Sequence, residues 1–191
     1  MQPSEAYHYI TRSKKRTRIL CHLDQPLTAR QMAHKIGLSF DACRETVRDL
    51  ALAGLVRCLN ESARRSRLYW LTRPGTACQR RVCQYLGRAV PKHYHPAVDW
   101  NLYGWVCYSH RATIVKTLSQ PMQPADIKRK AKARQSSLRM SANNVRDVMG
   151  LFLAHGIVRA IQRKKRAHRM YELTENGLQF QELLRRAEVP A

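Results

Sequence analysis

The stretch Arg67-Leu-Tyr-Trp-Leu-Thr-Arg-Pro-Gly75 returns later in the chain as Arg169-Met-Tyr-Glu-Leu-Thr-Glu-Asn-Gly177. Arg, Tyr, Leu, Thr and Gly coincide in the two copies at a constant offset of 102 residues. The same offset pairs Gly54-Leu-Val-Arg57 with Gly156-Ile-Val-Arg159. Similarity at a fixed separation indicates a repeated structural unit. We therefore predict that one small domain occurs twice.

Two further blocks extend the repeat towards the N-terminus of each copy. Ile19-Leu-Cys-His-Leu-Asp-Gln-Pro26 matches the eight residues from Ile114 at an offset of 95, and Tyr7-His-Tyr-Ile10 echoes Tyr103-Gly-Trp-Val106 at 96. The offset grows by seven between Met32 and Gly54, so the second copy holds seven extra residues within 129–144. This insertion predicts either a longer helix or an extended basic loop.

Each copy has the sequence signals of helix, helix, turn, helix, two-stranded hairpin and helix. Ser and Thr before an apolar run are typical N-caps, and Gly and Pro end helices and mark turns. In the first copy these signals predict helices at Arg18–Leu23, Thr28–Lys35 and Ser39–Gly54, strands at Leu55–Leu59 and Leu68–Leu71, and a last helix at Thr76–Val90. In the second copy they predict helices at Ser109–Leu118 and Pro124–Lys132, a helix capped by Ser141, a hairpin at Ile157–Leu173 and a helix at Glu175–Ala187.

The order of elements predicts a mainly α fold with small β-hairpins, that is, two tandem winged helix-turn-helix domains in the α+β class. Residues 1–90 form the first predicted domain and residues 100–191 the second, which carries the inserted basic segment in its helix-turn-helix. The segment 91–99 contains two prolines and no periodic pattern, so it is predicted to be a linker.

Both copies resemble the MarR-like and ArsR-like winged-helix regulators, particularly the small archaeal forms. The hairpin ending in Tyr-x-Leu-Thr-x-x-Gly carries the resemblance, together with Ile19-Leu20, Pro26, Gly37-Leu-Ser39 and their counterparts in the second copy. The resemblance implies a transcriptional regulator. It also implies dimers, although two heads in one chain could act as a pseudo-dimer, so a monomer and a homodimer both stay open.

The charge of the chain points to a polyanionic partner. Lys and Arg number 35 against 13 Asp and Glu, which gives a net charge of +22. Nucleic acid is the commonest polyanion that neutralises such a surface, and an acidic membrane surface is the second possibility. We expect double-stranded DNA in preference to RNA or single strands. The chain has neither a long apolar run nor the apolar core of a secretion signal, so we expect a cytoplasmic, nucleoid-associated protein.

The third helix of each copy is the predicted reader of bases. Arg44 and Arg48 lie four residues apart opposite the apolar face of the first, and arginine can pair bidentately with guanine. Alternatively they pair with Asp41 and Glu45 as solvated ion pairs. An asparagine can pair bidentately with adenine; alternatively, its side chain is only suited to the first turn of a helix. The corresponding residues of the second copy are Asn143, Asn144 and Arg146.

Three clusters of cations are predicted to grip phosphates. They lie at the first hairpin tip (Ala63–Arg67), at the second hairpin tip (Gln162–Arg169) and in the insertion. The residues are Arg64, Arg65 and Arg67 in the first tip; Arg163, Lys164, Lys165, Arg166 and Arg169 in the second; and Lys128, Arg129, Lys130, Lys132, Arg134 and Arg139 in the insertion.

The sequence gives little support for an enzyme, a metal protein or another class of function. No phosphate-cradling loop, zinc-protease helix or nucleophile elbow occurs, so we expect no enzyme and no cofactor. Six cysteines contain no CxxC pair, and Cys78 with Cys83, His93 and His95 is a loose metal candidate, so we expect no metal. The aromatic residues before the first helices could stack bases, but packing is favoured. A non-specific or structural nucleic-acid binder, such as a chromatin-like protein, replication initiator or RNA-binding protein, is the alternative function; an interaction scaffold is a third.

Overall fold

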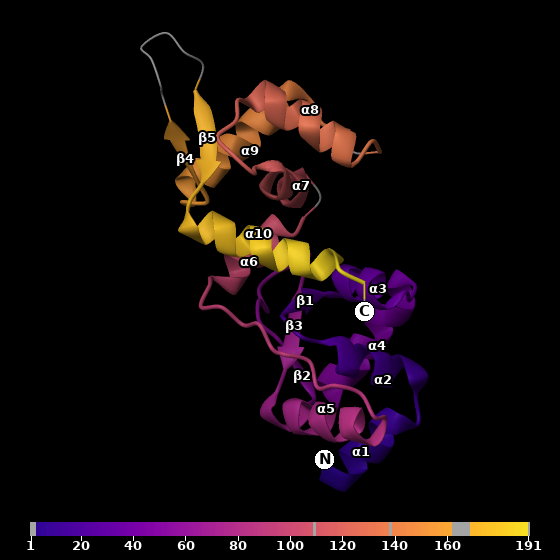
Figure 1. Cartoon of the computed structure of the whole chain (residues 1–191). Coiled ribbons are helices and arrows are strands. Elements are labelled where there is room, and N and C mark those ends of the chain that lie inside the picture. The colour runs from indigo at the N-terminus through magenta and orange to yellow at the C-terminus, as the bar shows by residue number, and fades with distance from the viewer. Residues whose placement is uncertain (1–2, 109, 138, 162–168, 191) are drawn as a thin grey trace. The chain divides into compact units, whose positions relative to one another are not determined.

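In the computed structural model the chain divides into two compact units, and the residues described are 3–108, 110–137, 139–161 and 169–190. Unit 1 comprises Met1–Trp105 with Arg186–Ala191, and unit 2 comprises Val106–Arg185. The described residues form ten helices and two small antiparallel sheets (Figure 1). No helix among them has the length and apolarity needed to cross a bilayer.

The helices of unit 1 begin at well-formed caps. Thr28 closes a capping box with Gln31, as each side chain accepts a hydrogen bond from the other residue's backbone N–H. Ser39 accepts from the Ala42 N–H at 3.3 Å, and Gly37 supplies the left-handed turn between the two helices with φ of 62°. These helices are α1 (Pro3–Thr11), α2 (Lys14–His22), α3 (Ala29–Ile36), α4 (Phe40–Leu52) and α5 (Arg73–Tyr85).

The sheet of unit 1 has three strands in the order β1-β3-β2. β2 (Val56–Cys58) and β3 (Leu68–Leu71) form the predicted hairpin, and β1 (Leu27–Thr28) pairs with β3 on its other edge. β1 was not predicted, because it has only two residues, the second of which is also the cap of α3, and so it shows no strand periodicity. It ties the start of α3 to the hairpin.

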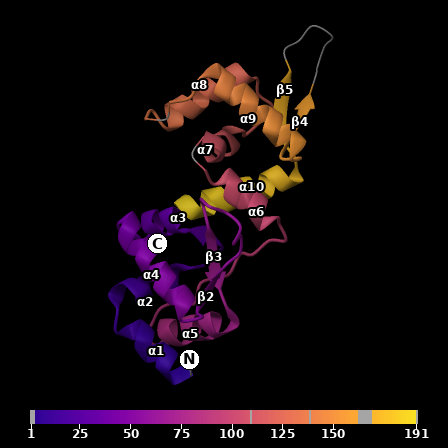
Figure 2. The ribbon, with the colours of Figure 1, turned by 180° about the vertical axis from the view of Figure 1, so that it is seen from behind.

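Unit 2 repeats this order of elements. β4 (Val158–Ile161) pairs with β5 (Met170–Leu173), so that Val158 lies opposite Leu173 and Ile161 opposite Met170. A bridge between Met122 and Tyr171 takes the place of β1. Its helices are α7 (His110–Thr117), α8 (Pro124–Arg134) and α9 (Ala142–Ala154), and α10 (Glu175–Glu188) follows the hairpin. α6 (Trp100–Val106) precedes them along the chain and belongs to unit 1 except for its last residue. Both views show α7, α8 and α9 packed together (Figures 1 and 2).

A buried glutamine locks the last helix to the first half of each unit. Gln79 on α5 donates to the carbonyls of Leu20 and Leu23 at 2.7 and 3.0 Å. Gln181 on α10 donates to the carbonyls of Val115 and Leu118 at 2.7 and 2.9 Å. Both amides satisfy carbonyls at the C-terminal end of a helix, which would otherwise have no partner within the helix. The repeat seen in the sequence thus recurs as a repeated set of contacts.

Several elements differ from the prediction, among them α2, which begins at Lys14 instead of Arg18. α5 starts at Arg73 because the Thr72 hydroxyl caps it, accepting from the Gly75 N–H at 3.1 Å, and it ends at Tyr85 instead of Val90. α1 and α6 cover the aromatic blocks that were predicted only to precede the first helices. The seven inserted residues divide: α8 is three residues longer than α3, and the connection to α9 is four residues longer than the one before α4.

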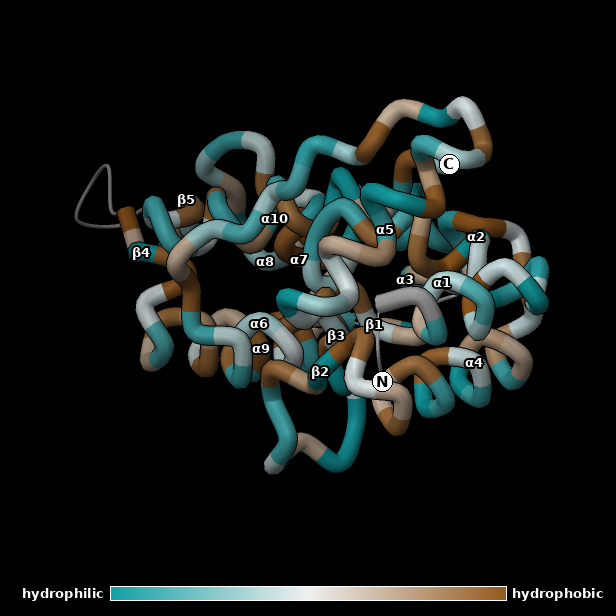
Figure 3. Tube along the Cα trace, turned by 90° about the horizontal axis from the view of Figure 1, so that it is seen from below, coloured by the Kyte–Doolittle hydropathy of each residue, from teal (hydrophilic) through white to brown (hydrophobic). Residues whose placement is uncertain are grey.

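The core of unit 1 lies between its helices and one face of its sheet. Figure 3 shows hydrophobic and hydrophilic residues alternating from turn to turn along α4. The buried stripe of this helix is Cys43, Val47 and Leu50, each at most 1% exposed. Spacings of three and four residues place these side chains on one face, so the opposite face is left for solvent or a partner.

Candidate nucleic-acid interface

The outer face of α4 carries the two arginines that the sequence singled out. Arg44 and Arg48 are exposed, one helical turn apart, and so are Asp41 and Glu45 beside them. Arg44 lies 3.5 Å from the Asp41 carboxylate, with side-chain exposures of 69% and 83%. An ion pair that is so exposed to water contributes at most about 1 kcal/mol to stability. A phosphate or a base edge can therefore displace Asp41 from Arg44 at small cost.

Phe40, at the N-terminal end of α4 and close to these arginines, is a residue that sequence analysis missed. It is the first residue of α4 and stays 41% exposed. The Arg30 guanidinium of α3 lies 5.3 Å from its ring centroid, and that of Arg44 lies 6.0 Å from it. Its spacing from Cys43 and Val47 matches the buried stripe, which predicts a core position. The signal that distinguishes it is its place directly after the Ser39 cap, at the open end of the stripe.

The first tip presents its cations from a fixed base. Asn60, 1% exposed, donates from Nδ2 to the Ser66 carbonyl at 3.1 Å and accepts from the Leu68 N–H at 2.7 Å. Ser66 adopts a φ of 53°, which turns the chain back into β3. The tip itself exposes its basic residues, which are Arg64, Arg65 and Arg67, the last donating from Nε to the Ala63 carbonyl at 3.0 Å.

The helix α6 braces this tip within unit 1. Ser62 donates to the Asn101 side chain at 3.3 Å. Gly104 packs against the base so closely that a Cβ there would lie 2.2 Å from Asn60 Nδ2. The arginines of the first tip therefore project from a base that is held on two sides, by β3 and by α6.

The insertion places most of its predicted cations in solvent. Lys128 is half-buried, whereas Arg129, Lys130, Lys132 and Arg134 are exposed along α8. Arg129 pairs with Asp126 at 2.7 Å, and Arg134 donates to the Lys116 carbonyl at 3.5 Å. Arg139 is exposed on the connection to α9, where its carbonyl lies 2.7 Å from His110 Nε2.

On α9 the three predicted base readers are exposed, but one of them has a structural task. The Ser141 hydroxyl donates to the Asn144 side-chain oxygen and accepts from the Asn144 N–H. Asn144 is thus part of the N-terminal cap, the alternative foreseen for it, while Asn143 and Arg146 carry the outer face. At the second tip Arg169 is exposed. The remaining predicted cations there, which are Arg163, Lys164, Lys165 and Arg166, lie outside the described residues.

The aromatic residues of unit 1 pack on one another. Trp70 of β3 contacts the rings of His93 and His95, with centroids 5.0 and 5.5 Å away, and His95 in turn contacts Trp100 at 4.8 Å. Tyr103 is fully buried. Desolvation lowers the pKa of both histidines below the usual value. This cluster holds the segment 91–99 on unit 1.

Cys21, Cys43 and Cys78 are buried in the core of unit 1. Burial raises the pKa of Cys21 to about 12, and that of Cys43 and Cys78 to about 11, so these thiols stay protonated at neutral pH. Among the residues described, no group of three or more His, Cys, Asp or Glu side chains could hold a metal.

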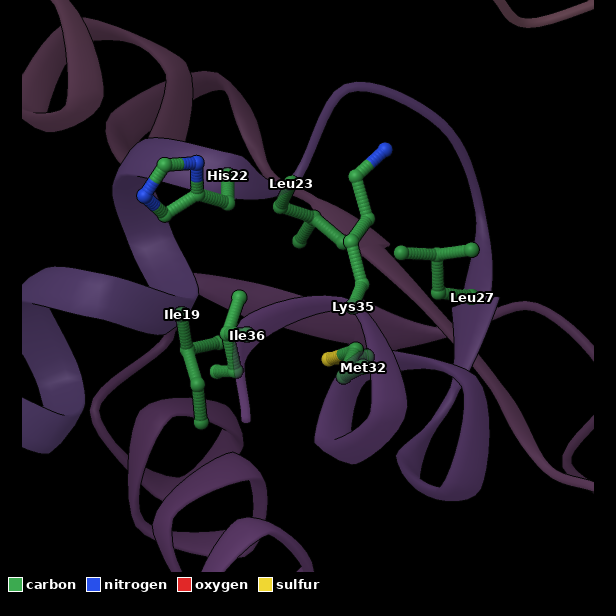
Figure 4. A pocket seen from close by; sticks show the side chains of 7 residues that line it. All are labelled: Ile19, His22, Leu23, Leu27, Met32, Lys35 and Ile36. Carbon is green, nitrogen blue, oxygen red and sulfur yellow. The ribbon is translucent and has the colours of Figure 1, made fainter. Parts of the chain in front are cut away.

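Figure 4 shows the recess, whose packed side chains leave no room for a water molecule. The Lys35 amine points out of the recess and binds both oxygens of Asp24, at 2.9 and 2.8 Å. Its lining residues are Ile19, His22, Leu23, Leu27, Met32, Lys35 and Ile36.

Comparison of the chain with models of known families, with curated proteins and with solved structures finds no match.

Proposed function

We propose that each unit is a winged helix-turn-helix domain and that the chain binds duplex DNA as a transcriptional regulator. The order of elements in unit 1 supports the domain type: helix α2, strand β1, the pair α3 and α4 joined at Gly37, the hairpin β2–β3 and helix α5. In such domains the second helix of the pair enters the major groove and the hairpin contacts the backbone.

One observation carries the proposal. A single unit presents exposed Arg44 and Arg48 on the outer face of α4 and exposed Arg64 and Arg65 on a braced hairpin tip. The chain as a whole holds 22 more cations than carboxylates. Clustered like charges repel one another in the free protein, and a polyanion relieves that repulsion. The proposal gives the chain no catalytic role, metal or cofactor, and places it with the nucleoid.

The alternative is a binder that grips nucleic acid without reading sequence. The number of exposed cations on α8 and in the first tip favours this alternative, because phosphate contacts carry no sequence information. Specific reading is favoured by the outer faces of α4 and α9, whose Arg44, Arg48 and Asn143 have side chains suited to base edges.

Fluorescence anisotropy of the full chain with labelled duplex DNA, single-stranded DNA and duplex RNA tests the proposal, followed by selection from a randomised duplex pool. We expect duplex DNA to bind most tightly and the pool to yield a consensus. Arg44→Ala with Arg48→Ala should weaken binding to the consensus more than to random duplex. Arg73→Ala with Arg80→Ala removes the same charge from α5 and serves as the control.

Equal affinity for every duplex would favour the non-specific alternative. Preference for RNA or single strands would overturn the DNA assignment. Binding that survives full screening of charge would point instead to a protein-interaction scaffold.

A further inference from the structure

At its N-terminal end α4 exposes part of an apolar ring, and one turn later it exposes a cation. Phe40 stays 41% exposed at the N-terminal end of the helix, where the neighbouring stripe residues are at most 1% exposed. A ring left partly in water keeps apolar surface that a partner can bury. The surroundings of this ring are cationic, because the guanidinium carbons of Arg30 and Arg44 lie 5.3 and 6.0 Å from its centroid.

We propose that Phe40 is a specificity-determining residue of unit 1, whose ring contacts the 5-methyl group of a thymine in the major groove while Arg44 reaches the neighbouring base. This inference rests on the proposed function and deepens it. The thymine methyl is the one apolar group that a base pair shows in the major groove, and phenylalanine is among the side chains that contact it. The flanking arginines attract the phosphates of DNA, so the ring and the cations are both suited to DNA as the ligand.

The flanking cations also orient the ring. Arginine attracted to an aromatic face restricts both side chains, so Phe40 is held in place before any partner arrives. Asp41 is the acidic neighbour of this site and lies 3.5 Å from Arg44 at 83% exposure. A phosphate offers this ring no apolar group, whereas a thymine does, which points to a base edge as the group that Phe40 meets.

The second unit provides an internal control. α4 and α9 have the same length and correspond residue by residue, with Arg44 opposite Arg146 and Phe40 opposite Ala142. Only the first of the two helices therefore starts with an aromatic ring. The thymine requirement is expected in the half-site of unit 1 and not in that of unit 2, and Phe40→Ala gives α4 the residue that α9 already has.

Replacement of thymine by uracil removes the methyl group and nothing else from the major groove. A duplex selected from a randomised pool is resynthesised with each thymine replaced singly by uracil, and binding is measured by anisotropy. We expect one thymine at which uracil weakens binding by wild-type chain about fourfold, the factor expected for one buried methyl group. Phe40→Ala should bind both duplexes equally, and Phe40→Leu, which keeps apolar surface, should retain part of the difference.

Tryptophan fluorescence and circular dichroism of Phe40→Ala check that the variant is folded. Uracil tolerance at every position, or an equal uracil penalty in wild type and Phe40→Ala, would overturn the inference and leave the proposed function standing. Failure to bind duplex DNA or to select any sequence would overturn both.

Discussion

Gly75 and Gly177 occupy corresponding positions where α5 and α10 meet the residue that precedes the first strand of each hairpin. A Cβ on Gly75 would lie 1.8 Å from the Leu55 carbonyl oxygen, and one on Gly177 would lie 2.2 Å from that of Ile157. Backbone atoms cannot move aside as a flexible side chain can. The final glycine of the repeated Tyr-x-Leu-Thr-x-x-Gly motif is therefore required by close approach and not by an unusual φ.

We predict that Gly75→Ala lowers the free energy of unfolding of unit 1 by about 3 kcal/mol, the upper range for forced overpacking. Gly150→Ala is the matched control, because Gly150 lies within α9 with open space around it. It should stabilise unit 2 by about 0.5–1 kcal/mol, since alanine suits a helix better than glycine.

Urea unfolding distinguishes the two effects. Trp70, Trp100 and Trp105 all lie in unit 1, so tryptophan fluorescence follows that unit and circular dichroism follows both. If Gly75→Ala leaves the urea midpoint of the fluorescence transition unchanged, the close approach of α5 to the Leu55 carbonyl is contradicted.

Single residues were predictable where one physical requirement determines them. The caps at Thr28, Ser39 and Ser141 follow from the hydroxyl that a helix start needs, and each accepts the predicted backbone hydrogen bond. The exposure of Phe40 was not predictable, because helical spacing assigns it to the buried stripe. Whether a side chain at the end of such a stripe is buried depends on what packs beyond the end of the helix. The spacing of apolar residues carries no information about that packing.

At the scale of elements, the segment 91–99 is held by two histidines whose pKa values are lowered by desolvation. His93 Nε2 lies 2.7 Å from Gln79 Oε1, and both His93 and His95 contact Trp70. On α2, desolvation, followed by the charges of Arg88 and Lys35, lowers the pKa of His22 as well. All three histidines belong to unit 1.

We predict that unit 1 loses stability as the pH falls from about 7.5 to 5.5, around the unperturbed histidine pKa of about 6.5. A lowered pKa in the fold means that the unfolded chain binds more protons, so acid favours unfolding. Tryptophan fluorescence in urea, recorded across this range, gives the midpoint. His93→Gln should flatten its pH dependence; the same slope in variant and wild type would rule out His93 as a contributor.

The elements with strong periodicity were predicted within a few residues, and the weak ones were missed. α3, α4 and α9 each combine a cap, an apolar stripe and a glycine after the last turn, so local signals agree. β1 has two residues, and α1 and α6 are short aromatic-rich helices whose stability comes from packing against the rest of unit 1. Their existence depends on tertiary contacts that no local pattern encodes. The insertion combined the two predicted alternatives, lengthening both α8 and the connection after it.

At the scale of the whole molecule, the two units offer unlike outer faces to a partner. α4 and α9 share an arginine at Arg44 and Arg146 but differ where Arg48 stands opposite Gly150 and Asp41 opposite Asn143. Under the proposed function one chain would therefore contact two different half-sites, and a monomer would suffice without a symmetric dimer.

Cations dispersed through both units make salt dependence the property that tests the whole chain at once. If the two tips together neutralise about six phosphates, the affinity for duplex DNA should fall about a thousandfold between about 50 and 200 mM salt. Arg64→Ala with Arg65→Ala should reduce the slope of log affinity against log salt by about 1.8, since each lost phosphate contact removes about 0.9. The control variant Arg73→Ala with Arg80→Ala, which carries the same net charge, should keep the wild-type slope. An equal drop in both variants would mean that net charge alone, and not the braced first tip, binds the phosphates.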